Sequence, residues 1–121
     1  MGTAGLTIAA VLCVTIAIVH SWLGERQILR IVLAATQDRR QSFRRIVRGA
    51  WHLTSFAWAV CGAVLAVYAV HPPGAAGRAV IVILGAFLVV NALTCLFVSG
   101  VRHPGVPIFL LAGLAALSAL I

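Results

Sequence analysis

Negative charge is almost missing from this chain of 121 residues, and lysine is missing altogether. The acidic residues are Glu25 and Asp38 alone, so the sequence offers no paired catalytic carboxylates, and general acid–base chemistry would fall to histidine. Charged residues make up 9% of the chain, whereas about a quarter is usual in a soluble domain. This excludes a water-facing surface around the whole molecule. With 63% hydrophobic residues, the lipid bilayer is the expected solvent for most of the surface.

Enzyme and disulfide signatures are also missing. The chain contains no Gly-rich phosphate loop and no G-x-S-x-G elbow, which argues against an enzyme of those classes. Cys13, Cys61 and Cys95 lie inside apolar segments without C-x-x-C spacing. We expect them to be small packing residues rather than a disulfide framework or a soft-metal site.

What the sequence does contain is four apolar segments, at about 3–23, 50–70, 78–99 and 106–121. About 20 apolar residues span the hydrocarbon core as a helix, and the first three segments reach that length, whereas the last is shorter. The first segment lacks the basic start of a signal peptide, so we expect it to be retained. The predicted fold is all-α: a single transmembrane domain over residues 1–121, forming an integral membrane four-helix bundle.

Seven of the nine arginines fall in the loop at about 24–49. Arg102 lies between the third and fourth segments, and Arg78 on the opposite side, so the positive-inside rule places both arginine-bearing loops in the cytoplasm and both termini on the outer side. We expect anionic lipid headgroups to be the counter-charge. A nucleic-acid surface is not expected, since Phe43 is the one aromatic residue among the loop arginines.

Within this loop the apolar residues at 28–33 predict that the first helix continues as an amphipathic arm along the interface. Residues 36–38 predict a turn. Ser42 or Asp38 is the expected N-cap of the next helix.

Small residues follow one face of each helix, as expected where helices pack closely in lipid. The predicted buried stripe of the first helix is Ala9, Cys13, Ala17, His20 and Gly24. That of the second is His52, Ser55, Ala59, Gly62, Ala63 and Ala66. The Ala112-x-x-x-Ala116 pattern of the last helix suggests a contact surface. A chain this small has a thin core, so we expect a homo-oligomer or a place in a larger membrane complex.

Polar side chains gather in the cytoplasmic half of the predicted bundle. The candidate ligand-binding residues are His20, His52, Ser55, Asn91 and Thr94. An amide or imidazole at that depth needs a partner, because leaving it bare in hydrocarbon is costly. The simplest interpretation is that the histidines are interfacial residues hydrogen-bonded to neighbouring polar groups.

Two cofactor hypotheses compete with it. A transition metal would use His20, His52 and His103 with Glu25, although Glu25 points about 140° away from His20 unless the helix breaks near Gly24. A haem b would use His20 and His52 as axial ligands from neighbouring helices. A small oligomeric transporter is a third alternative, since ionisable groups within a membrane are functional candidates.

The runs His20-Ser-x-Leu-Gly-Glu25 and Trp51-His-Leu-Thr-Ser55 resemble small four-span bacterial inner-membrane proteins of unassigned function. The resemblance implies a four-helix fold and a multi-pass protein of the bacterial inner membrane, and it carries over no activity. We therefore expect a non-enzymatic membrane subunit or a small-molecule-binding protein with a histidine-containing site in the cytoplasmic leaflet.

Overall fold

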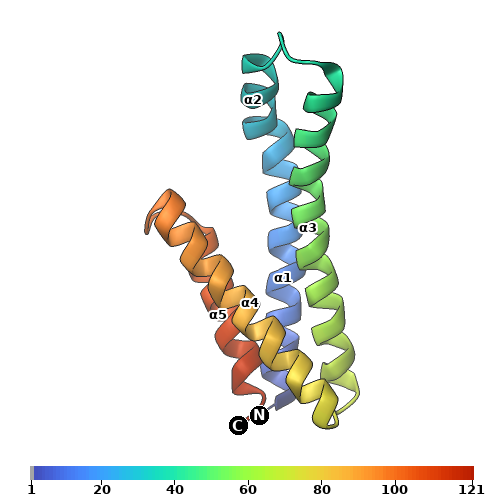
Figure 1. The fold of residues 1–121 in the computed structure, drawn as a ribbon. Helices are drawn as coiled ribbons and strands as arrows, with labels where there is room; N and C mark the ends of the chain where they lie inside the picture. The colour runs from blue at the N-terminus through green and yellow to red at the C-terminus, as the bar shows by residue number, and fades with distance from the viewer. Residues whose placement is uncertain (1) are drawn as a thin grey trace.

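A computed structural model describes residues 2–121, and all its regular elements are helices (Figure 1). In chain order these are α1 (Gly2–Leu23), the π-helical turn η1 (Gly24–Ile28), α2 (Leu29–Ala35), α3 (Gln41–Val70), α4 (Ala75–Ser99) and α5 (Gly105–Ser118). The predicted all-α class is confirmed.

The first helix continues beyond its apolar segment, as predicted for the amphipathic arm. α1, η1 and α2 form one rod of 34 residues, Gly2–Ala35, and Leu29 and Leu33 are buried on its arm. The turn predicted at 36–38 follows. The predicted N-cap is wrong: α3 begins at Gln41, so that Ser42 is already inside its first turn, and Arg40 occupies the N-cap position without a side-chain capping bond.

Three of the helices in residues 2–121 are long and apolar enough to cross a membrane. α5 is apolar but has 14 residues, so it rises about 21 Å against a hydrocarbon core of about 30 Å. It ends at Ser118, before the predicted end of the fourth segment, because the last residues form a turn. Gly100, with φ of 80°, ends α4 and leads into the short connection to α5.

The helices form two hairpins. We call α1, η1, α2 and α3 the N-terminal hairpin and α4 with α5 the C-terminal hairpin. α1 packs against both α3 and α5, whereas α3 and α4 touch little. The hairpins lie together near the two chain termini and diverge toward the end that carries α2 (Figure 1).

Glycines let helix backbones approach one another closely in the half of the molecule that holds the chain termini. A Cβ on Gly5 would lie 2.5 Å from the Ala115 carbonyl oxygen on α5, and one on Gly62 would lie 2.9 Å from the Ala10 carbonyl oxygen. Ala112 and Ala116 are fully buried within the same chain. α5 therefore uses this predicted contact surface inside the protomer.

The predicted stripe of α1 is confirmed, since Ala9, Cys13, Ala17 and Gly24 are buried and His20 is partly buried. The stripe of α3 is only partly right. Ala63 and Ala66 are exposed. Two large side chains, Trp58 and Leu65, are buried on the inner face of α3 together with Ser55, Cys61 and Gly62.

Candidate functional site

His20 lies in a stack of aromatic rings where the hairpins diverge. Its ring is parallel to that of Trp51, with 4.2 Å between centroids, and meets Trp58 edge-on at 4.8 Å. Trp58 in turn meets Phe109 of α5 edge-on at 4.6 Å. Such pairs add to the stabilisation from burial. The stack therefore fixes the plane of the His20 ring between helices α1, α3 and α5.

Hydrogen bonds fix the same ring and its neighbour. His20 Nδ1 is 2.8 Å from the Oγ of Ser55, which is 6% exposed, and Trp51 Nε1 donates to the His20 carbonyl oxygen at 3.1 Å. His20 Nε2 forms no hydrogen bond with residues 2–121 and remains available to a ligand. His20 is thus hydrogen-bonded to a polar group of a neighbouring helix, as expected in the simplest interpretation of the sequence.

Gly24 makes this stack sterically possible. A Cβ at position 24 would lie 1.8 Å from Trp51 Nε1 and would therefore overlap the indole ring. The π-helical turn η1 begins at the same residue, with the Leu29 N–H bonded to the Gly24 carbonyl oxygen. π-helical turns of this kind are rare and occur often at functional sites.

A second polar network lies beside the stack. His52 Nε2 donates to Glu25 Oε1 at 2.8 Å, and the same oxygen accepts from Arg48 Nε at 2.9 Å. The other ring nitrogen of the same imidazole, Nδ1, lies 2.6 Å from the Ser21 hydroxyl oxygen. Ser21 and Glu25 are four residues apart on the first helix and so face the same imidazole.

These contacts shift the titration of Glu25, which lies outside the apolar segments. The hydrogen bond from His52, with the nearby Arg48 guanidinium, lowers the pKa of the Glu25 carboxyl below its ordinary value, against an opposing effect of burial. Glu25 is therefore held as a carboxylate that ties the first helix to α3.

Ser21, His52 and Glu25 are the residue types of a hydrolase triad, but their geometry differs from that of a triad. Ser21 lies inside α1, where neighbouring N–H groups serve helix hydrogen bonds, so no oxyanion-binding pair accompanies it. The imidazole also bonds the carboxylate through Nε2 and the serine through Nδ1, the reverse of the usual triad. We interpret the network as a clamp between helices.

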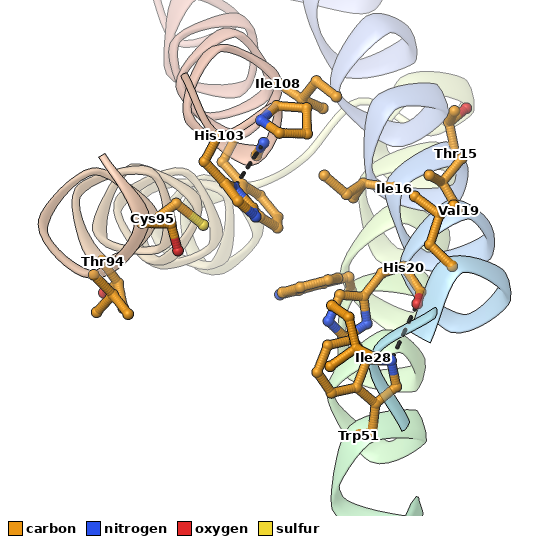
Figure 2. A pocket seen from close by; sticks show the side chains of 17 residues that line it. Thr15, Ile16, Val19, His20, Ile28, Trp51, Thr94, Cys95, His103 and Ile108 are labelled. Atoms are coloured by element: carbon orange, nitrogen blue, oxygen red, sulfur yellow. Dashed lines mark hydrogen bonds between the residues drawn. The ribbon is translucent and has the colours of Figure 1, made fainter. Parts of the chain in front are cut away.

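A cavity of about 320 Å³ separates the hairpins beside the aromatic stack (Figure 2). We call it the cleft. Seventeen residues line it, most of them apolar, from α1, η1, α3, α4, α5 and the α4–α5 connection. The side chains with polar atoms that line it include His20, Trp51, Thr94, Ser99 and His103. It is thus an apolar space with a few polar groups on its wall, the usual character of a small-molecule site.

The structure brings some predicted ligand-binding residues to the cleft and leaves others outside. His20 and Thr94 line it, whereas His52, Ser55 and Asn91 do not. Ser55 contacts the Nδ1 side of the His20 ring. Asn91 Oδ1 accepts a hydrogen bond from Trp58 Nε1 at 3.2 Å. This bond is the one side-chain hydrogen bond between the two hairpins in the described part of the chain. Asn91 thus has the partner that its depth required.

The metal and haem hypotheses gain no support from this geometry. No group of three or more His, Cys, Asp or Glu side chains within residues 2–121 is arranged to hold a metal ion. Both ring nitrogens of His52 already have partners, and His103 Nδ1 accepts from the Gly105 N–H at 3.1 Å (Figure 2). Although the helix changes its winding at Gly24, Glu25 bonds His52 and not His20.

Sequence reasoning missed four participants. Trp51 and Trp58 form the stack, and Ser21 and Arg48 complete the clamp. The clamp could have been found from the i, i+4 spacing in the sequence. Arg48 and His52 are four residues apart on one helix, and Ser21 and Glu25 are four residues apart on the other.

Comparison with known protein families, with curated proteins and with solved structures finds no match to this chain.

Proposed function

We propose that this chain is a small integral membrane protein that binds a small, mainly apolar molecule in the cleft between its hairpins. The ligand carries one polar group, which pairs with His20 Nε2. The observation that carries the proposal is the coincidence of an apolar cavity of about 320 Å³ with an imidazole whose ring is fixed and whose outer nitrogen has no partner among the described residues.

Preorganisation supports binding over a purely structural role. Trp51, Trp58 and Ser55 hold the His20 ring before any ligand arrives, so little side-chain freedom is lost on binding. A histidine needed only to satisfy its own polarity would have both nitrogens bonded, as His52 does. The arrangement supports recognition of a ligand rather than catalysis.

The distribution of arginines supports an orientation with the arginine-rich loop in the cytoplasm against anionic headgroups and the cleft opening into the cytoplasmic leaflet. The resemblance of the sequence suggests that the membrane is a bacterial inner membrane. Large apolar side chains are exposed along α1, α3, α4 and α5, among them Ile18, Phe56, Ile83 and Leu111. Lipid or other membrane subunits would cover them, and this supports self-association or docking on a larger complex.

Quenching of tryptophan fluorescence tests the cleft. The probe is phosphatidylcholine brominated near the middle of its acyl chain, since bromine quenches an indole only at short range. Trp22 is exposed and would report general lipid contact, so the measurement uses the Trp22→Phe chain, in which Trp51 and Trp58 remain and both line the cleft.

A matched pair of variants gives the answer. Cys95→Phe places a ring in the cleft, whereas Leu93→Phe adds a ring on the same helix, outside the cleft. We expect brominated lipid to quench the parent and Leu93→Phe strongly and Cys95→Phe clearly less, with equal helicity by circular dichroism. Equal quenching in the two variants would mean that apolar molecules do not enter the cleft, and the proposal would fail.

A further inference from the structure

A second cavity lies away from the cleft, between α2 and the first turns of α3. Its volume is about 240 Å³, and its lining residues are Leu33, Gln41, Arg44, Arg45 and Arg48. We call it the arginine pocket. Three arginine side chains therefore line one small cavity, and bringing like charges together in this way is unfavourable unless an anion lies among them.

The chain does not supply enough negative charge of its own. Arg48 Nε pairs with Glu25 at 2.9 Å, and that carboxylate also accepts from His52. Across residues 2–121 no other arginine forms an ion pair, and the remaining acid, Asp38, has no cationic partner. Arg44 and Arg45 thus face the arginine pocket without a counter-charge.

Two further features point to a missing acceptor. Arg44 Nε is buried and has no hydrogen-bond partner, the single such side-chain atom in the part of the chain that the structure describes. Buried donors are nearly always paired, so this one marks a place where an acceptor is expected. The lining residues of α3, Gln41, Arg44, Arg45 and Arg48, also share one face of that helix at spacings of three and four residues, opposite Leu33 of α2, so their side chains meet at the same cavity.

We infer that the arginine pocket binds a phosphate group. Several guanidinium forks match the several acceptor oxygens of a phosphate better than a single carboxylate does, and arginine is the side chain that recognises phosphate in this bidentate way. The phosphate can belong to a lipid headgroup or to a soluble molecule, and the chemistry of recognition is the same. The site is separate from the cleft, so it stands or falls independently of the proposed cleft ligand.

The test uses the full chain purified in detergent. Native mass spectrometry counts bound short-chain phosphatidic acid, with phosphatidylcholine as the comparison because its choline masks the phosphate charge. In a second arm, inorganic phosphate competes with the lipid. Displacement by inorganic phosphate assigns a site that also takes soluble phosphates, whereas binding that only the lipid achieves assigns a headgroup site. Either result supports the inference.

Two double variants of equal charge separate a built site from general attraction. Arg44→Gln with Arg45→Gln removes two guanidiniums from the pocket, whereas Arg39→Gln with Arg40→Gln removes two from the neighbouring turn. We expect one phosphatidic acid per chain, with affinity lowered about tenfold or more by the first pair and within about twofold by the second. Arg44→Lys with Arg45→Lys keeps the charge and should weaken binding by an intermediate factor.

Equal losses in the two glutamine pairs would show that net charge, not the pocket, attracts the lipid, and would overturn the inference. So would the lack of any saturable binding to the unaltered chain. Circular dichroism and tryptophan emission establish that each variant keeps its fold before its affinity is compared.

Discussion

Replacing Gly24 with alanine tests the central packing claim, because helix propensity and the structure predict opposite outcomes. An alanine inside a helix is ordinarily more stable than a glycine by about 1 kcal/mol. At position 24 the added methyl group would lie 1.8 Å from Trp51 Nε1, so the indole must leave its place.

The cost follows from what Trp51 loses. Its hydrogen bond to the His20 carbonyl oxygen contributes about 1 kcal/mol, and its parallel contact with the His20 ring about 0.5–1.5 kcal/mol. Overpacking adds strain of about 1–3 kcal/mol. Set against the propensity gain, Gly24→Ala should lower the free energy of unfolding by about 1.5–4.5 kcal/mol.

Gly49→Ala is the matched control. Gly49 lies inside α3, and a Cβ there would meet nothing within 4 Å, so this variant should be neutral or more stable by up to about 1 kcal/mol. Unfolding in mixed detergent, followed by circular dichroism, measures both, and tryptophan emission reports the displaced indole. If the two variants shift stability in the same direction, the stack on Gly24 is not formed.

Three further predictions concern the polar contacts. Folding lowers the pKa of Glu25 from its ordinary value of 4.5, so the carboxylate stabilises the fold above about pH 4.5, and this stabilisation disappears as pH falls through the lower folded pKa. Glu25→Gln should remove that part of the pH dependence of the unfolding free energy. Parallel acid-unfolding profiles of the two chains would refute this prediction. Ser55→Ala leaves His20 Nδ1 without its partner and should cost about 1–3 kcal/mol in unfolding free energy, against less than about 0.5 kcal/mol for Ser118→Ala, whose hydroxyl bonds only its own helix. Asn91→Leu removes the bond between the hairpins and should shift Trp58 emission, whereas Thr94→Val, which loses a bond within α4, should leave the emission unchanged.

The sequence was sufficient for the helices because their signals are local. Apolar runs and the small-residue face of α1 predicted the helices and one buried stripe. The inner face of α3 was predicted less well. Small residues and large aromatic ones both pack between helices, and only the position of α5, which supplies Phe109, decides that Trp58 is buried there.

The candidate site was predictable in its depth but not in its connections. His20, His52 and Ser55 were expected at one level, and they do lie there. Which imidazole meets which serine depends on the rotation of α1 against α3, and hydrophobic periodicity defines that rotation too coarsely. The π-helical turn at Gly24 had no sequence signal that distinguishes it from an ordinary helix.

The divergence of the two hairpins has a mechanical consequence. The close backbone approach between them, of Gly5 on α1 to Ala115 on α5, lies near the chain termini. Farther along, Trp58 connects them through its hydrogen bond to Asn91 and its edge-on contact with Phe109. Because the hairpins are packed closely near the chain termini, a small change in the angle between them widens or narrows the distance between their opposite ends by a larger amount. For the ligand proposed above, this angle sets the size that the cleft admits.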